Sequence, residues 1–170
     1  MRIPGAATVR RAAWLAAASA IVPNAKRAPL LRRLGLRGMD EPFLCAGISL
    51  AGQGQNLTSG PGCFVNGEVY IEGGPVRLGT NVYIGPRAMI LTSTHEMGAH
   101  DRRAGEPMHR AVEIGDGTWS GAGAIVLPGV SIGAGCVIGA GAVVTRDCAP
   151  DGVYVGVPAH RVRDLPDDEG

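Results

Sequence analysis

Residues 114–144 read IGDGTWSGAGAIVLPGVSIGAGCVIGAGAVV, and every sixth residue is aliphatic or a substitute for an aliphatic residue. A compact residue lies four places after each of these positions, as at Ala124 and Ala142. A fixed short period indicates one structural unit that is stacked many times. The six-step series continues on both sides of an interruption, as Leu78, Ile84 and Ile90, and then as Ile114, Ser120, Val126, Ile132, Ile138 and Val144.

A unit of six residues is too short for a helix–strand pair. It fits one flat face of a parallel β-helix, in which three units close one triangular coil. The aliphatic side chain then points into the prism, and glycine takes corners where the backbone needs unusual dihedral angles. Successive coils are expected to stack at about one strand spacing, roughly 4.8 Å. The sequence therefore predicts an all-β fold.

The β-helix is predicted over residues 44–163. One full coil covers 78–95, and the repeat then breaks over 96–113, a stretch rich in glycine, arginine and histidine. A long segment that interrupts a regular array predicts a projecting loop with a function, and this loop is placed to form one wall of a cleft. Two further coils follow from Ile114, and a final strand is expected at 153–157.

An N-terminal helical arm is predicted over residues 1–43, with one helix over 6–22 and a second short helix over 29–36. The arm is basic, with eight arginine or lysine residues and no acidic residue through position 39. A solvated helix face beside the core explains this charge, although a contact with phosphate groups or a membrane surface is the alternative. Residues 164–170 form an acidic tail.

The composition of the 170 residues limits the possible functions. The net charge is +1, which gives no indication of a nucleic-acid partner. No apolar run reaches the length of a membrane span, so no transmembrane segment is expected. The four cysteines form no C-x-x-C pair, and Cys136 and Cys148 occupy compact inward positions of the repeat. This usage predicts a reduced, cytoplasmic protein without a disulfide framework or a zinc site.

His95 is the leading candidate for chemistry, because it ends a complete coil at the start of the interruption. Imidazole titrates near neutral pH, so it can accept a proton from a hydroxyl group. The position alone also fits a polar residue at a strand end.

Residues 62–163 resemble the hexapeptide-repeat acyltransferases, in particular the branch that contains the maltose, galactoside and Nod-factor O-acetyltransferases. Four segments carry the resemblance: Phe64-Val65-Asn66, Thr92-Ser93-Thr94-His95, Ile114 to Trp119, and the run from Gly139 to Ala159. The resemblance implies a left-handed parallel β-helix and a homotrimer with active sites between neighbouring subunits. It also implies transfer of an acetyl group from acetyl-CoA to a hydroxyl of a sugar or glycosylated acceptor, without a metal.

By position, His95 matches the catalytic base of this family, which acts by direct transfer without an acyl-enzyme. Asn66 and the backbone amide of Ala122 match the groups that stabilise the oxyanion, a charge that needs fixed donors. Glu72 and Asn66 match acceptor-binding positions. The resemblance implies a CoA site that consists of Trp119 beside the pantetheine arm, Ala122, Ala140 and Thr145 along it, and Arg146 and Arg163 at the phosphates.

Two departures from the family pattern concern the acceptor side of the site. Glu96 follows the histidine where many relatives have proline, and Glu72 stands where the family has aspartate. The first leaves the orienting partner of His95 open, and the second changes the pocket geometry. The acceptor, which is either a hydroxyl or an amine, stays open, as does the length of the acyl chain.

Two other functions are compatible with the same prism. The γ-type carbonic anhydrases bind zinc through three histidines, and His95 and His100 have the spacing of two of them. No histidine precedes His95, so the third ligand is missing from the sequence. A structural β-helix without activity is the second alternative, and it would need neither His95 nor CoA.

Overall fold

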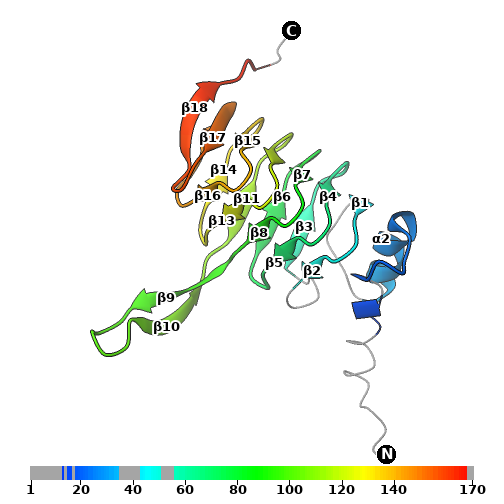
Figure 1. Ribbon diagram of the computed structural model, residues 1–170, viewed down its shortest axis with the longest axis horizontal. Helices are drawn as coiled ribbons and strands as arrows, with labels where there is room; N and C mark the ends of the chain where they lie inside the picture. The colour runs from blue at the N-terminus through cyan, green and yellow to red at the C-terminus, as the bar shows by residue number, and fades with distance from the viewer. Residues whose placement is uncertain (1–12, 14, 17, 35–42, 51–55, 168–170) are drawn as a thin grey trace, which may run out of the picture.

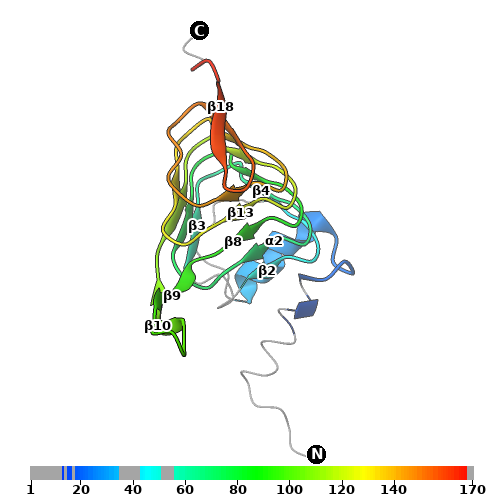
Figure 2. The same cartoon turned by 60° about the vertical axis from the view of Figure 1, so that its left-hand side comes forward.

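A computed structural model shows a three-sided prism of short parallel strands, with a hairpin that projects from one side (Figure 1). It describes residues 13, 15, 16, 18–34, 43–50 and 56–167. The view turned by 60° shows nested coils with a triangular outline (Figure 2). The predicted all-β parallel β-helix is therefore confirmed.

Each side of the prism is one sheet. The first consists of β1 (Phe43–Leu44), β4 (Phe64–Val65), β7 (Tyr83–Ile84), β12 (Trp119–Ser120), β15 (Val137–Ile138), β17 (Gly152–Val155) and β18 (His160–Asp164). The second consists of β2 (Ser49–Leu50), β5 (Tyr70–Ile71), β8 (Met89–Ile90), β13 (Ile125–Val126) and β16 (Val143–Val144). The third consists of β3 (Leu57–Ser59), β6 (Val76–Leu78), β11 (Val112–Ile114) and β14 (Ser131–Ile132).

The six-step residues point inward and stack in columns. On the first sheet Val65, Ile84, Ser120 and Ile138 lie in register and are all buried. Ser120 replaces an aliphatic residue at a buried position, and its hydroxyl accepts a hydrogen bond from the backbone N–H of Gly85 at 3.4 Å. This bond satisfies a buried polar group that would otherwise destabilise the core.

The outward columns give each sheet a different surface. The first sheet, which we call the aromatic face, presents the half-buried Phe64 and the exposed Tyr83 and Trp119 in register. The second, the aliphatic face, presents Tyr70, Met89, Ile125 and Val143. The third, the polar face, presents Thr58, Arg77, Glu113 and Ser131. Two of the three sides are thus apolar outside as well as inside.

The projecting loop predicted over 96–113 is a β-hairpin in the structure. Strand β9 (Ser93–Met97) pairs antiparallel with β10 (Ala104–His109), and the repeat resumes at Val112. The segment therefore starts and ends earlier than the sequence indicated. Extended residues that leave the prism need hydrogen-bond partners, and here the two arms supply them to each other.

The arm holds helix α2 (Asn24–Arg33), which begins five residues before the predicted start at Pro29 and includes that proline. Ala28 and Leu31 are buried with Leu44 of β1, so packing against the first coil outweighs the preference of proline for a helix start. The helix predicted over 6–22 falls largely outside the described residues. Its described members between 13 and 18 are helical.

Arg27 fastens this arm to the prism, and its side chain is only 1% exposed. Its guanidinium donates to the carbonyl of Leu44 at 2.8 Å, to that of Ser19 at 3.0 Å and to that of Val22. It also donates to the side-chain oxygen of Asn24. One cation thus ties the helix, the segment before it and the first strand together.

The opposite end of the prism ends in an antiparallel pair. β17 begins at Gly152 and ends at Val155, two residues short of the predicted strand end, and β18 extends to Asp164 at the start of the acidic tail. Among the described residues, no helix has the length and apolar character needed to cross a membrane.

Three cysteine thiols, those of Cys63, Cys136 and Cys148, are buried. Burial, together with the charges of Cys136 and Asp147, raises the pKa of Cys148 to about 11. Cys136 and Cys148 occupy the compact inward positions predicted from the repeat and act there as small apolar residues.

Candidate active site

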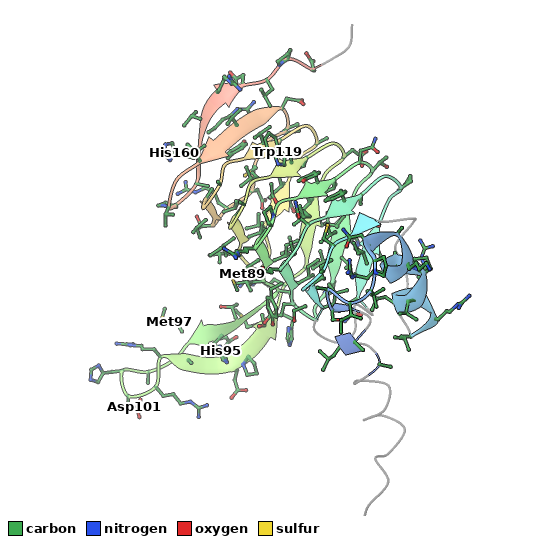
Figure 3. All side chains as sticks on the ribbon, turned by 45° about the vertical axis from the view of Figure 1, so that its right-hand side comes forward. Met89, His95, Met97, Asp101, Trp119 and His160 are labelled. Atoms are coloured by element: carbon green, nitrogen blue, oxygen red, sulfur yellow. The ribbon has the colours of Figure 1, made fainter. Side chains whose placement is uncertain are left out.

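His95 lies in the middle of β9 with an exposed side chain, and Pro107 of β10 is its partner across the hairpin. Figure 3 shows its side chain on the projecting hairpin, away from the wall of the prism that carries Trp119. Side chains alternate along a strand, so Ser93, His95 and Met97 lie on one face of the hairpin. Met97 is 84% exposed, which gives this face an apolar end.

The carboxylate of Glu72 lies at the base of the hairpin. One oxygen accepts hydrogen bonds from the backbone N–H groups of Thr92 and Ser93, each at 2.7 Å, and the other accepts from the Ser93 hydroxyl at 2.5 Å. Partial burial acts to raise the pKa of Glu72, but these hydrogen bonds and the charge of His109 hold it below its usual value. Both oxygens of this predicted acceptor-binding residue have partners within the chain.

Asn66 follows β4 and turns its side chain over the aromatic face. Its Nδ2 donates to the hydroxyl of Tyr83 at 3.0 Å, and its Oδ1 accepts from the N–H of Gly67 at 2.8 Å. Tyr83 stacks on Phe64 with ring centroids 4.9 Å apart. The second N–H of the Asn66 amide remains available as a donor, since an amide nitrogen carries two.

Trp119 extends the same column by one coil and is 53% exposed, as the outward repeat position predicted. Tyr83, the neighbour of Trp119 in this column, was not predicted as a site residue. The register of the repeat would have revealed it, because Tyr83 holds the equivalent position one coil earlier.

Ala122 and Ala140 stack at the corner between the aromatic and aliphatic faces, where the N–H of Gly141 donates to the carbonyl of Ala122 at 2.8 Å. Both are exposed and small. Within the described part of the chain, the N–H of Ala122 donates no hydrogen bond. This amide therefore remains a possible donor at the corner beside Trp119.

Thr145 and Arg146 follow β16 at the next corner. Arg146 lines a pocket of about 440 Å³ whose other lining residues include Tyr154, His160 and Arg161. His160 and Arg161 were missed in the sequence, although they lie beside the Gly156 to Ala159 segment that carried part of the resemblance. Arg163, the other predicted phosphate ligand, is an exposed residue of β18, opposite Val153.

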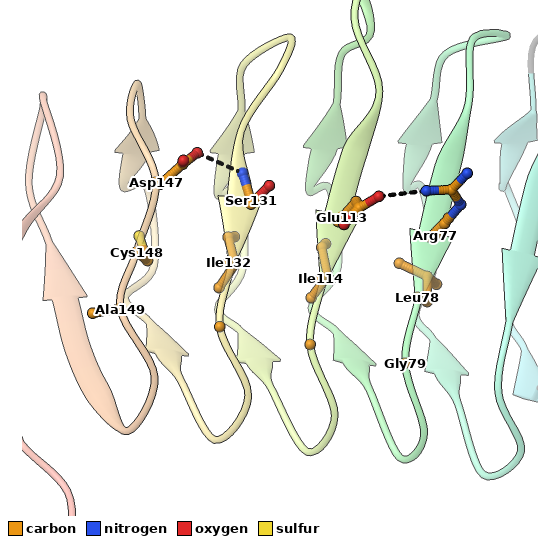
Figure 4. A pocket seen from close by; sticks show the side chains of 12 residues that line it. Arg77, Leu78, Gly79, Glu113, Ile114, Ser131, Ile132, Asp147, Cys148 and Ala149 are labelled. Carbon is orange, nitrogen blue, oxygen red and sulfur yellow. Dashed lines mark hydrogen bonds and ion pairs between the residues drawn. The ribbon is translucent and has the colours of Figure 1, made fainter.

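A groove of about 650 Å³ runs along the polar face and contains none of the predicted site residues (Figure 4). Its charged groups are already paired. Arg77 and Glu113 form an ion pair at 2.5 Å, and Asp147 accepts from the N–H of Ser131 at 2.8 Å. The groove therefore offers few unpaired polar groups to a ligand.

Six of the nine predicted site residues fall into two groups on one chain, apart from Thr145, Arg146 and Arg163 at the last coils. Asn66, Trp119, Ala122 and Ala140 lie on the aromatic face and its adjoining corner, whereas His95 lies on a hairpin that leaves from the far corner of the aliphatic face. Glu72 belongs to the hairpin group. No contact within the described chain joins His95 to Asn66 or Trp119.

Groups of three or more histidine, cysteine, aspartate or glutamate side chains that could hold a metal ion do not occur among the described residues. His95 lies on β9 and His100 lies in the turn of the hairpin. The carbonic anhydrase interpretation thus lacks its third ligand in this part of the chain.

A family model described as "Bacterial transferase hexapeptide (six repeats)" matches residues 111–146. This segment contains the stretch from which the repeat was deduced. It extends from β11 to the residues after β16, over the coils next to the hairpin.

Curated relatives are similar over the β-helix. Nodulation protein L from Rhizobium meliloti is 43% identical over 111 residues, which are 65% of this chain and 60% of that protein. Galactoside O-acetyltransferase from Lactococcus lactis is 36% identical over 117 residues, which are 68% of this chain and 56% of that protein. The chain thus spans less than two thirds of these relatives.

A solved structure is similar over nearly the whole chain. It is a hexapeptide-repeat acetyltransferase from Vibrio cholerae, complexed with acetyl-coenzyme A. The TM-score is 0.80 at 26% identity, and the match covers 98% of this chain and 94% of that chain.

Proposed function

The chain belongs to the hexapeptide-repeat transferases, and on that premise we propose that it is an O-acetyltransferase that moves an acetyl group from acetyl-CoA to a hydroxyl of a sugar or glycosylated acceptor. The observation that carries the proposal is the placement of the candidate groups. His95 lies on an exposed hairpin, whereas the proposed oxyanion donors and the indole of Trp119 share another face. The acetyl-CoA bound to the similar Vibrio cholerae structure supports the choice of donor.

In the proposed reaction, Nε2 or Nδ1 of His95 accepts the proton of the acceptor hydroxyl. The oxygen attacks the thioester carbonyl, and the carbonyl oxygen becomes an oxyanion that takes hydrogen bonds from the free N–H of Asn66 and the amide of Ala122. Collapse of this intermediate breaks the C–S bond. The thiolate of CoA leaves with the proton held on His95, so the base is regenerated.

A second copy of the chain completes this site. The two groups of residues lie on different sides of one prism, so His95 of one subunit meets Asn66 and Trp119 of a neighbour. The outward columns are apolar on the aromatic and aliphatic faces and polar on the third face. This pattern supports a head-to-tail contact in which the aromatic face of one copy packs against the aliphatic face of the next. Three such contacts close a homotrimer whose polar faces point to solvent.

The CoA moiety is proposed to lie across the last coils. The small residues Ala140 and Thr145 allow an extended pantetheine arm to approach the backbone, and the pocket at Arg146 takes the phosphates. His160 and Arg161 line the same pocket, and Arg163 lies on the same strand. Guanidinium groups suit this role, because they bind phosphate in a fixed fork geometry.

The proposal is tested by incubating the purified protein with acetyl-CoA and a panel of hydroxyl acceptors, including mono- and oligosaccharides. We expect acceptor-dependent release of free thiol and a mass of three chains by light scattering. A protein that stays monomeric and binds no acetyl-CoA would contradict both parts of the proposal. Release of thiol only with amine acceptors would retain the donor and change the acceptor class.

Truncation of Trp119 is expected to weaken the CoA site. Trp119→Ala should raise the dissociation constant for CoA by about 10-fold or more, because an exposed indole on the proposed interface contributes like an aromatic hot spot. Trp119→Phe keeps a ring and should lose less. Titration calorimetry with CoA measures both, and equal affinities in all three proteins would remove Trp119 from the cofactor site.

A further inference from the structure

We propose that Glu72 is a positioning residue, whose carboxylate holds the base of the β9–β10 hairpin and thereby sets where His95 lies. The contacts that carry this inference are present in the single chain. The catalytic consequence rests on the proposed function, because it requires His95 to act on a substrate.

Three donors converge on the one carboxylate. The N–H groups of Thr92 and Ser93 and the hydroxyl of Ser93 lie at 2.7, 2.7 and 2.5 Å from its oxygens. The side-chain oxygen of Thr92 accepts in turn from the N–H of Gly74 at 3.0 Å, and Thr92 is fully buried. The carbonyl of Thr92 accepts from the N–H of Arg110 at 2.8 Å, which closes the hairpin.

The position of Glu72 in the repeat matches the point where the chain leaves the prism. Glu72 belongs to a column of residues that hold the same position on successive coils, and the next members are Leu91, Leu127 and Thr145. Among the described residues of this column, Glu72 has the one carboxylate. The hairpin departs one coil later, at Thr92 and Ser93, directly after Leu91, which is the register equivalent of Glu72. Backbone amides that depart from a regular ladder need another acceptor, and Glu72 supplies one for both Thr92 and Ser93.

The restraint at Ser93 extends to His95 through the strand. The two residues are on the same face of β9, two positions apart, or about 7 Å along an extended strand. His109 lies opposite Ser93 and Pro107 opposite His95, so the second arm moves with the first. A tilt at the base therefore displaces the imidazole, and a misplacement of about 1 Å costs on the order of 100-fold in rate.

The family resemblance implied a different role for Glu72, that of an acceptor ligand. The two roles predict different kinetics. Loss of a direct acceptor ligand raises the KM for the acceptor, whereas loss of a positioning contact lowers kcat. Because both oxygens already accept hydrogen bonds within the chain, the positioning role accounts for the observed contacts without a ligand.

The kinetic test uses Glu72→Gln, which keeps the shape but removes the negative charge and replaces one acceptor oxygen by an NH2 group that cannot accept from the Ser93 hydroxyl. We expect kcat to fall by about 10- to 100-fold, with KM values for acceptor and acetyl-CoA within about twofold of the original. Glu113→Gln is the matched control, since it removes a carboxylate from an exposed ion pair on the polar face and should leave kcat unchanged. A raised acceptor KM at unchanged kcat would overturn the positioning role.

A second measurement does not depend on activity. The hairpin turn carries Arg102 and Arg103, both exposed, which trypsin can cut when the hairpin opens. Glu72→Gln should speed this cleavage and the amide exchange of Ser93, whereas Glu113→Gln should not. Unchanged cleavage and exchange in Glu72→Gln would disprove the clamp, whatever reaction the protein catalyses.

The outcomes separate the clamp from the proposed function. Faster cleavage in Glu72→Gln, together with no acetyl transfer by the unmutated protein, would support the clamp and reject the transferase proposal. If Glu72→Gln does not fold, Ser93→Ala removes one of the three hydrogen bonds and should show the same changes to a smaller degree. Native cleavage and exchange rates in Ser93→Ala would then count against the clamp.

Discussion

Replacement of His95 by alanine is expected to lower kcat by roughly 10²–10⁴-fold, the usual contribution of a general base. The side chain is exposed on β9 and makes no hydrogen bond within the described chain, so its loss should leave the melting temperature and the proposed trimer unchanged. Steady-state kinetics with a confirmed acceptor measures the effect, and thermal unfolding measures the stability of the same samples.

His100→Ala is the matched control for this prediction, because His100 lies in the turn of the same hairpin and is also exposed. We expect near-normal turnover in this variant. Near-normal turnover in His95→Ala would exclude His95 as the base. Equal losses in the two variants would indicate that the hairpin acts as a whole, without a specific role for the His95 imidazole.

The inward residues of the prism could be predicted because the period of six repeats the same environment in each coil. A buried position such as Ile132 is identified by Ile114 before it and Val144 after it. Ser120 fits the series although it is polar, since the pattern fixes its place and a backbone N–H satisfies its hydroxyl. Periodicity therefore gave the fold and the outward direction of Trp119.

The hairpin and the arm could not be predicted to the same extent, since neither repeats. Thr94 pairs with Met108 across the hairpin, and this pairing depends on contacts between two segments. Neither segment is repeated elsewhere in the chain. Helix α2 begins at Asn24, and its Arg27 donates to the carbonyl of Leu44 on the first coil, a tertiary contact that local propensity does not show. Local propensity predicts a helix start at Pro29 instead.

Candidate site residues can be proposed one by one from the resemblance, but their distribution over the faces could not be predicted. The resemblance indicated His95, Asn66 and Trp119, yet their separation on one chain is visible only in the structure. Glu72 shows the same limit. Its position after β5 was known from the sequence, but its three donors arise from a coil that departs from the repeat at Thr92.

Substitution of Gly115 by alanine is expected to destabilise the protein strongly, because there is no space for a side chain between the coils. A Cβ atom at Gly115 would lie 2.5 Å from the nitrogen of Ala134, 2.7 Å from the carbonyl carbon of Gly133 and 2.9 Å from the Cα of Ala134. All three atoms belong to backbone, so the coils must part. Overpacking typically costs about 1–3 kcal/mol, and we expect Gly115→Ala to reach or exceed ~3 kcal/mol.

Gly117→Ala is the control, since it adds the same methyl group two residues later in the same turn, between β11 and β12. Gly117 has φ +65°, and no atom lies within 4 Å of the position of an added Cβ. Only the left-handed backbone conformation then opposes alanine, at about 1–2 kcal/mol. Urea unfolding of both variants at equal chain concentration measures the difference, and equal losses would contradict the account of coil spacing.

The chain itself contains a comparison for this prediction. The column of Gly115 holds glycine at Gly79 and Gly133, each of which has the backbone of the next coil within 3 Å of a would-be Cβ. The last member of the column is Ala149, which is exposed beyond the final strand of the polar face. Glycine therefore occurs where another coil stacks and alanine where none does, so coil spacing, and not corner conformation, is expected to dominate the cost of Gly115→Ala.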